Sequence, residues 1–235
     1  MTRVLLVRHG RTSANAAGVL AGRSPDVHLD DVGISQALAV GELLRGVPIT
    51  GIVSSPLPRT METAKLIRGC LPPAAAPRVS RDKALLECDY GDWTGKKLKR
   101  LSKDPLWAVV QAHPSSITFP GGESMLASQT RAVGSVRAWA ARSAAEFGDR
   151  AIVLIVSHGD IIKSVVADAL GMHLDAFQRI VIDPGSVTAI DYTPLRPFVR
   201  LVNASADISA DLCAGVPTES DAAVGGGAGH KSGRK

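Results

Sequence analysis

The chain has 235 residues, of which 45% are apolar, and a formal net charge of +5. This length fits one large domain or two small ones with a sizeable core, and no apolar stretch is long enough to span a bilayer. The modest positive charge fits a small anionic ligand and does not call for nucleic acid. Three widely spaced cysteines, Cys70, Cys88 and Cys213, argue against a disulfide framework and favour a reducing, cytoplasmic setting.

Apolar runs alternate with helical patterns along the chain, which indicates an α/β fold with a mostly parallel sheet. Strands are expected at 3–8, 51–54, near 78–80, and at 151–156, 187–192 and 198–202. Helices are expected from the cap at Asp30 or Asp31 to about 46, and over 56–68, 123–147 and 159–170, the last ended by Gly171. Ser13 is expected to cap a short helix, and 84–122 to hold one or two short helices among loops.

The periodicity fades after about Asn203. The stretch 225–229 is nearly all glycine and has almost no side chains to bury. We therefore expect a single domain over residues 1–203 and a disordered tail over 204–235.

The tripeptide Arg8-His9-Gly10 directly follows the apolar run 4–7. The run predicts a buried strand, and Gly10 predicts a turn at its carboxyl end, where α/β folds bind ligands. A histidine beside an arginine is held neutral, because a second positive charge is disfavoured. Since a neutral imidazole can act as a nucleophile and an arginine can hold an anion, the motif predicts phosphoryl transfer through a phosphohistidine.

Four further polar residues stand beside predicted strands or in loops. Asn15 follows His9 closely, and its amide can donate to a phosphate oxygen. Arg59 lies in the first turn of a predicted helix, where helix amides and a guanidinium can bind an anion together. Glu87 opens an irregular loop, and His158 follows the strand at 151–156.

These segments resemble the motifs of the histidine phosphatase superfamily, also called the phosphoglycerate-mutase-like family. The matching segments are the RHG signature at 8–10 with Thr12 and Asn15, SSPLxR at 54–59, ExxxGxWxG at 87–95, GGES at 121–124 and SHG at 157–159. All five stand in the family's order, from residue 3 to about 192. Thr94 and the stretch 183–186 depart from the family's usual residues, which leaves the substrate preference open.

The resemblance implies a three-layer α/β/α sandwich and a role for each matched residue. His9 would attack phosphorus and become phosphorylated, while Arg8, Arg59 and His158 surround the transferring group. Glu87 would protonate the leaving oxygen and then activate water. Asn15 and Gly159 complete the expected substrate-binding set with Arg8, Arg59 and His158. No metal and no cofactor is expected.

Three functions are compatible with this pattern. The first is a hydrolase acting on small phosphorylated metabolites. The second is a cofactor-dependent phosphoglycerate mutase, which must keep water away from the phosphohistidine, and which family members achieve with an elaborated segment before the second histidine. Here positions 88–157 comprise only 70 residues, which favours the phosphatase. The third is a non-catalytic module for phosphorylated ligands, which is disfavoured because His9 and the arginines are present.

The same residues leave metal binding and self-association to consider. His9, His158 and Glu87 could form a two-histidine, one-carboxylate zinc site, but two nearby arginines would repel a dication. The expected partner is a small phosphomonoester, with no nucleic acid and no membrane. Many members of the family self-associate, so the resemblance leaves a homodimer open.

Overall fold

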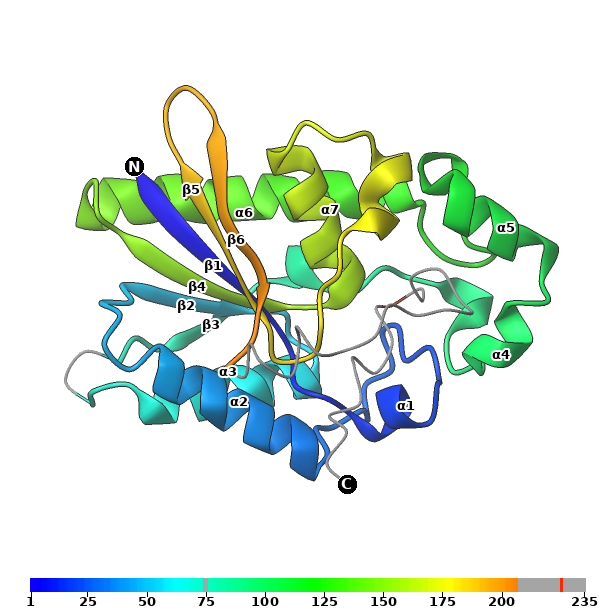
Figure 1. The fold of residues 1–235 in the computed structure, drawn as a ribbon, viewed down its shortest axis with the longest axis horizontal. Helices are drawn as coiled ribbons and strands as arrows, with labels where there is room; N and C mark the ends of the chain where they lie inside the picture. The colour runs from blue at the N-terminus through cyan, green and yellow to red at the C-terminus, as the bar shows by residue number, and fades with distance from the viewer. Residues whose placement is uncertain (74–75, 207–224, 226–235) are drawn as a thin grey trace.

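The computed structural model describes residues 1–73, 76–206 and 225, and there the chain forms a mixed α/β fold with a six-stranded sheet between helices (Figure 1). The strands are β1 (Thr2–Arg8), β2 (Gly51–Ser54), β3 (Val79–Arg81), β4 (Ile152–Ser157), β5 (Val187–Tyr192) and β6 (Pro197–Ala204). The α-helices are α1 (Ser13–Ala16), α2 (Asp31–Leu43), α3 (Pro58–Cys70), α4 (Leu98–Leu101), α5 (Pro105–Ala112), α6 (Met125–Phe147) and α7 (Gly159–Ala169). Short 3-10 helices are Lys83–Leu85, Gly91–Trp93, Pro114–Ser116 and Leu174–Arg179.

The sheet has the strand order β3-β2-β4-β1-β5-β6. Strands β3, β2, β4 and β1 run parallel, whereas β5 and β6 join antiparallel. This confirms the predicted α/β class with a mostly parallel sheet. In the register of the central strands, Val156 of β4 pairs with both Val7 of β1 and Ser54 of β2. The three central strands therefore end at the same level, and the residues that follow them share one edge of the sheet.

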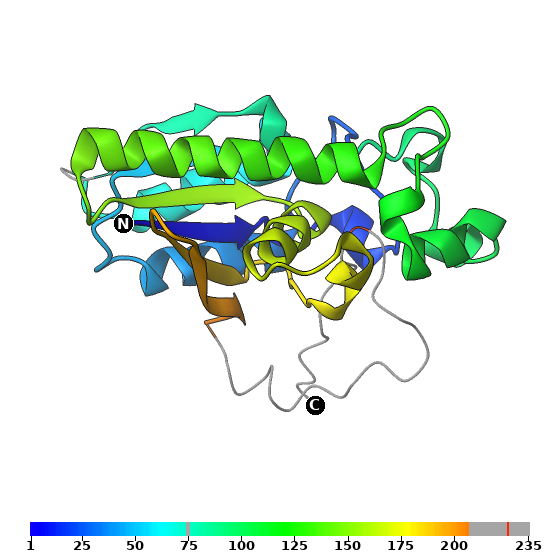
Figure 2. The same ribbon diagram turned by 90° about the horizontal axis from the view of Figure 1, so that it is seen from above.

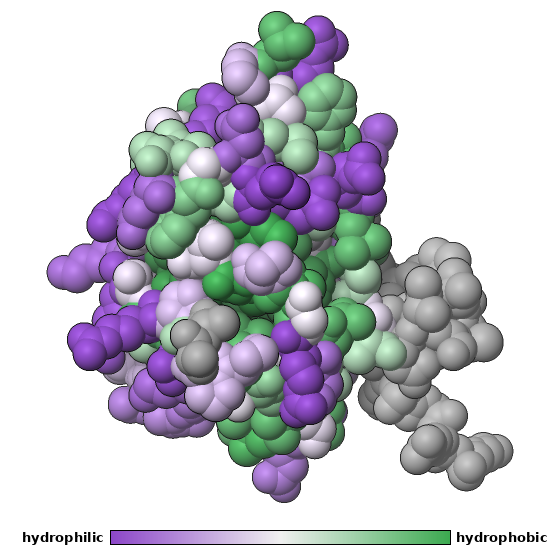
Figure 3. Space-filling view, turned by 90° about the vertical axis from the view of Figure 1, so that its left-hand side faces the viewer, coloured by the Kyte–Doolittle hydropathy of each residue, from purple (hydrophilic) through white to green (hydrophobic). Residues whose placement is uncertain are grey.

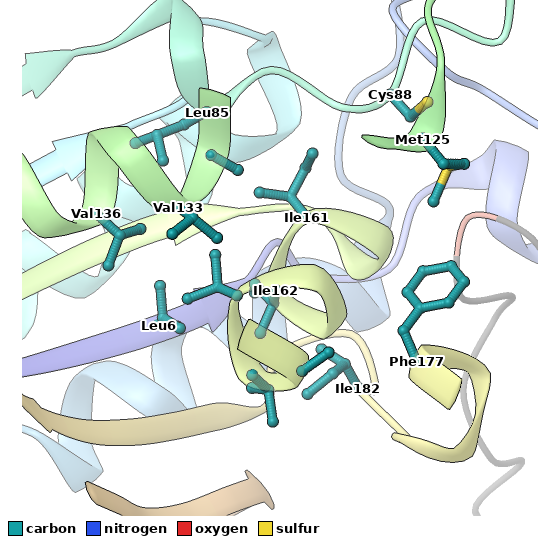
Figure 4. Close-up of a cluster of buried hydrophobic side chains, with 14 of the residues drawn as sticks. Leu6, Leu85, Cys88, Met125, Val133, Val136, Ile161, Ile162, Phe177 and Ile182 are labelled. Atoms are coloured by element: carbon teal, nitrogen blue, oxygen red, sulfur yellow. The ribbon is translucent and has the colours of Figure 1, made fainter. Parts of the chain in front are cut away.

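Both faces of the sheet are covered, because successive side chains of a strand point to opposite faces. Val4 and Leu6 of β1 belong to one buried cluster, which contains side chains of α6 and α7. Figure 4 shows Leu6 of this cluster facing Ile162 of α7, with residues of α6 close by. Leu5 and Val7 belong to a second cluster with α2 and α3. Figure 2 shows the resulting layers, with α6 along one face of the sheet and α2 along the other.

Three predicted helix starts are displaced by one or two residues, each for a local reason. The helix predicted from position 56 begins at Pro58, because a residue before proline is pushed out of the helical region, and Leu57 is extended at φ −67° and ψ 147°. Helix α1 is capped by Thr12, not by Ser13, since Thr12 and Asn15 form a reciprocal capping box. Helix α6 begins at Met125, because the Ser124 side chain accepts from the Ala127 N–H.

The end of the molecule at which β1 begins is shown in Figure 3, where hydrophilic residues surround hydrophobic ones. Arg3 at the start of β1 donates to Asp191 of β5 from both Nε and Nη2, at 2.7 and 2.9 Å.

Among the described residues, no helix combines the length and the apolar character needed to cross a membrane. The predicted tail mostly falls on residues outside the description, although β6 extends to Ala204 and Gly225 is described.

Candidate active site

The site lies at the carboxyl edge of the central strands. His9 follows β1, Ser55 follows β2 and His158 follows β4. The ladder continues past the strand ends, because the His9 N–H donates to Ser157 O and the Ser55 N–H donates to Val156 O, each at 3.0 Å. In Figure 1 these strand ends meet near the first turns of α3 and α7. The predicted placement of Arg59 in a first helical turn agrees with the start of α3.

Gly10 allows the close turn that presents His9. A Cβ atom at position 10 would lie 2.3 Å from the carbonyl oxygen of Gly33 in α2, which no side chain tolerates. The Gly10 N–H donates to Thr63 Oγ1 at 3.1 Å. The glycine of the motif is therefore required by the packing of the turn against α2.

His9 has a defined tautomer. Its Nδ1 lies 2.7 Å from the carbonyl oxygen of Gly10, and because a carbonyl only accepts, Nδ1 carries the proton. Nε2 keeps its lone pair and accepts from Arg59 Nε at 3.3 Å. Burial, and then the charges of Arg59 and Arg8, hold the pKa of His9 well below its usual range. His9 is thus a neutral imidazole with a nucleophilic nitrogen at neutral pH.

Arg59 joins both histidines. Its Nη2 donates to Gly22 O at 2.6 Å and to His158 Nδ1 at 3.3 Å. Its Nη1 is buried and has no hydrogen-bond partner among the residues that the structure describes. Burial lowers the pKa of Arg59 to about 10, which still leaves it a cation at neutral pH. A buried donor of this kind is costly unless a ligand accepts from it, so Arg59 is suited to bind an anion.

Arg8 supplies a second buried guanidinium. It is fully enclosed, with Nη1 donating to Ile182 O at 2.7 Å and Nη2 to Gly225 O at 3.2 Å. Burial lowers its pKa, and the nearby charge of Glu87 partly opposes this. Two buried guanidinium groups, those of Arg8 and Arg59, thus lie close enough to His9 to lower its pKa.

His158 lies beside His9, with ring centroids 5.3 Å apart in an edge-to-face arrangement. Since its Nδ1 accepts from Arg59, Nε2 carries the proton and donates to Ser55 Oγ at 2.8 Å. Burial, and then Arg59, hold the pKa of His158 well below its usual range. Gly159 follows it as the first residue of α7 and is buried.

Glu87 is buried within the same region, with 3% of its surface exposed. Its Oε1 accepts from the Cys88 N–H at 3.0 Å. Burial, and then the charge of Asp160, raise the pKa of Glu87 to about 7, against the opposing effect of Arg59 and Arg8. A carboxyl group with this pKa can give up a proton and take one back near neutral pH.

The loop that carries Glu87 is held by a charged cluster. The Glu87 carbonyl accepts from Arg23 Nε at 2.9 Å and from Arg131 Nη2 at 3.1 Å. Both arginines also donate to Glu123 Oε1, at 2.8 and 2.6 Å. The GGES segment at 121–124 therefore lies against the loop and fixes it. A Cβ at Gly122 would lie 2.2 Å from the carbonyl oxygen of Asp89, so the two loops pack backbone to backbone.

A pocket opens onto these groups. It is lined by His9, Thr12, Asn15, Val19, Leu20, Ala21, Gly22, Arg59, Glu87, Tyr90, Leu98 and Gly225. Asn15 is thus at the pocket as predicted, with its Oδ1 accepting from Thr12 N and Oγ1 at 3.1 and 2.8 Å. Gly159 is adjacent to His158 but is not among the lining residues. The structure therefore gathers His9, Arg59, Glu87 and Asn15 around one pocket, with Arg8 and His158 beside them.

Several pocket and neighbouring residues were not singled out from the sequence as part of a site. Tyr90, Gly22 and Leu98 line the pocket, and Ser55 holds His158. Asp160 is not a lining residue, but its Oδ2 accepts a hydrogen bond from the Tyr90 hydroxyl at 2.7 Å. Tyr90 and Ser55 lay inside quoted motifs, whereas Leu98 and Asp160 had no signal beyond their nearness to a motif in sequence.

The zinc alternative can be compared with this geometry. The lone pairs of His9 Nε2 and His158 Nδ1 both face Arg59. Within the described part of the chain, no group of three or more histidine, cysteine, aspartate or glutamate residues is placed to hold a metal ion. This arrangement is therefore better suited to bind an anion than a cation.

Comparison with known proteins agrees with the fold. Residues 4–205 match the model of the histidine phosphatase superfamily, branch 1. A relative from Salmonella choleraesuis strain SC-B67, described as a probable phosphoglycerate mutase GpmB, is 34% identical over 194 residues, which are 82% of this chain and 86% of that protein.

Solved structures give the same picture. A putative α-ribazole-5′-phosphate phosphatase from Escherichia coli has a TM-score of 0.73 and 27% identity, covering 86% of this chain and 96% of the other. A mycobacterial glucosyl-3-phosphoglycerate phosphatase in complex with VO3 has a TM-score of 0.76 and 26% identity, covering 86% and 99%. The chain belongs to the histidine phosphatase superfamily, as the motifs predicted. Its relatives include phosphatases and a phosphoglycerate-mutase-like protein, which supports an enzyme acting on small phosphorylated molecules.

Proposed function

We propose that this protein is a phosphomonoesterase that hydrolyses small phosphorylated metabolites through a phosphohistidine on His9. The observation that carries the proposal is found at Arg59: its Nε donates to the His9 Nε2 lone pair at 3.3 Å, and its buried Nη1 has no acceptor among the described residues. A phosphoryl group bound at Arg59 would bring phosphorus to that lone pair. Phosphoryl transfer depends chiefly on such positioning and on electrostatic stabilisation.

The reaction takes two steps. His9 Nε2 attacks phosphorus, the bond from phosphorus to the ester oxygen breaks, and Glu87 transfers its proton to the departing alkoxide. Arg8, Arg59 and His158 surround the three remaining oxygens. Glu87, now a carboxylate, takes a proton from water as the water oxygen attacks phosphorus. The bond from phosphorus to Nε2 then breaks, which releases inorganic phosphate and restores both His9 and Glu87.

Hydrolysis is favoured over mutase activity by the charge of the pocket wall. A phosphoglycerate presents a carboxylate beside its phosphate, and a mutase needs cations for both. Arg59 is the one lysine or arginine among the described lining residues, and Val19, Leu20 and Leu98 are apolar. The neighbouring arginines are already paired: Arg11 Nε donates to Asp30 at 2.8 Å, and Arg23 donates to Glu123 at 2.8 Å.

Inhibition and chelation distinguish this proposal from the zinc alternative. With p-nitrophenyl phosphate as substrate, we expect turnover that orthovanadate and inorganic phosphate inhibit competitively and that EDTA leaves unchanged. A hydrolase releases inorganic phosphate, whereas a mutase interconverts 2- and 3-phosphoglycerate in the presence of 2,3-bisphosphoglycerate. Measuring both reactions separates the two activities. Loss of activity on chelation with recovery on adding zinc would support the metal site instead, and binding without turnover would support a non-catalytic module.

Leu98→Lys tests the charge of the pocket wall. A lysine there adds a cation beside the leaving group, and a charged hydrogen bond is worth roughly 1.5–3 kcal/mol. We therefore expect kcat/KM for 3-phosphoglycerate to rise about tenfold relative to phenyl phosphate. The control is Leu38→Lys, on α2, where the side chain is 42% exposed. An unchanged ratio in a folded Leu98→Lys protein would mean that Leu98 does not face the leaving group.

A further inference from the structure

Asp160 is a buried carboxylate that the reaction steps above do not use. It lies in the first turn of α7, two residues after His158, and is 1% exposed. Its Oδ2 accepts from the Tyr90 hydroxyl at 2.7 Å and from the Gly225 N–H at 3.0 Å. Its Oδ1 is buried with no hydrogen-bond partner among the described residues. Burying a carboxylate with an unsatisfied oxygen is costly, so its presence beside the site calls for a role.

Tyr90 connects Asp160 to the loop of Glu87. It follows Glu87 by three residues, is fully buried, and lines the pocket with Glu87. Its ring packs edge to face on Phe119, with centroids 5.0 Å apart, and its hydroxyl ends on Asp160. The ring is therefore held at both ends, by packing and by a hydrogen bond to a charged acceptor. This fixes one wall of the pocket next to Glu87.

We propose that Asp160 is a positioning residue for the acid–base step: its carboxylate orients Tyr90 beside Glu87, and its charge favours the neutral form of Glu87. The inference rests on the proposed function, in which Glu87 must hold a proton before it can deliver one. Two carboxyl groups buried close together do not both ionise easily, so one of them retains its proton. Asp160 accepts hydrogen bonds from Tyr90 and Gly225, and Glu87 is the member of the pair whose pKa is raised.

The charges around Glu87 shift its pKa in both directions. Burial and Asp160 raise its pKa, whereas the Cys88 N–H, Arg59 and Arg8 lower it, in that order of importance. The other titratable groups that face this region are the neutral imidazoles of His9 and His158, the Tyr90 hydroxyl and the Cys88 thiol. The other charged groups are Arg23 and Arg131 at the Glu87 carbonyl, and Lys163, which donates to Gln178 Oε1 at 2.9 Å. Asp160 is therefore the charged side chain that opposes the two arginines.

The test is the pH dependence of kcat/KM in Asp160→Asn. Asparagine keeps the shape and an oxygen that accepts from Tyr90, but it lacks the charge. We expect the alkaline limb of the pH profile, which the pKa of Glu87 sets, to lie about one pH unit lower than in the wild type. At pH 7 the protonated fraction of Glu87 falls from about one half to about one tenth, so glycerol 3-phosphate should react about fivefold more slowly. p-Nitrophenyl phosphate, whose leaving group needs less protonation, should change little.

Two further variants separate charge from structure. Asp168→Asn, on the same helix and paired with Arg137 at 2.7 Å, should leave the pH profile unchanged. Tyr90→Phe removes the hydroxyl but keeps the Asp160 charge, so it should lower kcat without moving the alkaline limb downward. Circular dichroism checks the fold, and if Asp160→Asn does not fold, Asp160→Ser provides the charge removal.

The outcomes are distinct. An alkaline limb that stays in place in a folded charge-removal variant, with both substrates slowed equally, would overturn the role of Asp160 while leaving the hydrolysis intact. A wild-type protein that releases no phosphate from either substrate would instead remove the proposed function, and the inference with it.

Discussion

His9→Ala is expected to lower phosphatase turnover by about 10³- to 10⁶-fold, the scale seen when a nucleophile is removed from a group of residues that act together. His9 is the one histidine among the described residues that lines the pocket, whereas His158 is not a lining residue and has both ring nitrogens bonded, to Arg59 and to Ser55. The variant should also form no acid-labile phosphoenzyme. Initial rates of phosphate release and acid-quenched labelling with a ³²P substrate measure the two effects.

The matched control is His28→Ala. His28 has a half-exposed side chain and contacts Glu62 outside the pocket. It should retain full turnover and full labelling. Labelling that persists in folded His9→Ala would show that another residue is the nucleophile. An unchanged rate would contradict a phosphohistidine on His9.

Glu87→Gln is expected to lower kcat/KM for glycerol 3-phosphate by about 10²- to 10⁴-fold, the usual contribution of a general acid. In the wild type the pKa of Glu87 is raised to about 7, so activity should fall as the pH rises above 7 and the proton is lost. Glutamine cannot lose a proton, so this alkaline limb should disappear. A pH series with glycerol 3-phosphate and p-nitrophenyl phosphate measures both effects, and equal loss for the two substrates would contradict the acid role.

The same substitution should change stability with a definite sign. The pKa of Glu87 is higher in the folded protein than the usual 4.5, so the folded state holds the proton more tightly than the unfolded chain. The stability that this group contributes is complete below pH 4.5 and is lost as the pH rises to about 7. The loss amounts to about 3 kcal/mol. Glu87→Gln should therefore gain stability relative to the wild type over this range.

Urea unfolding of both proteins at pH 4.5, 6 and 8 measures that difference. His9 and His158 contribute the opposite slope, since their lowered pKa values destabilise the fold as the pH falls below their usual range. Both proteins contain these histidines, so their effect largely cancels in the comparison. A stability difference that does not vary with pH would show that Glu87 titrates normally in the folded state.

The secondary structure followed from local patterns in the chain. The apolar runs at 3–8, 51–54 and 151–156 form β1, β2 and β4, because β-branched and aliphatic residues suit strands that are buried on both faces. The displaced starts of α1, α3 and α6 depended on capping hydrogen bonds or on a proline, which the periodicity of apolar residues does not reveal.

What the sequence by itself determined was the family, the α/β class and the motifs that gather at one edge of the sheet. The carboxyl ends of parallel strands share an edge, so motifs that follow strands meet there. Only the tertiary structure decided the tautomers of His9 and His158, the pairing of Arg23 with Glu123, and the place of Asp160 beside the Glu87 loop. Each of these depends on burial and on contacts between residues remote in the chain, since charge and proton affinity take their values from the assembled surroundings.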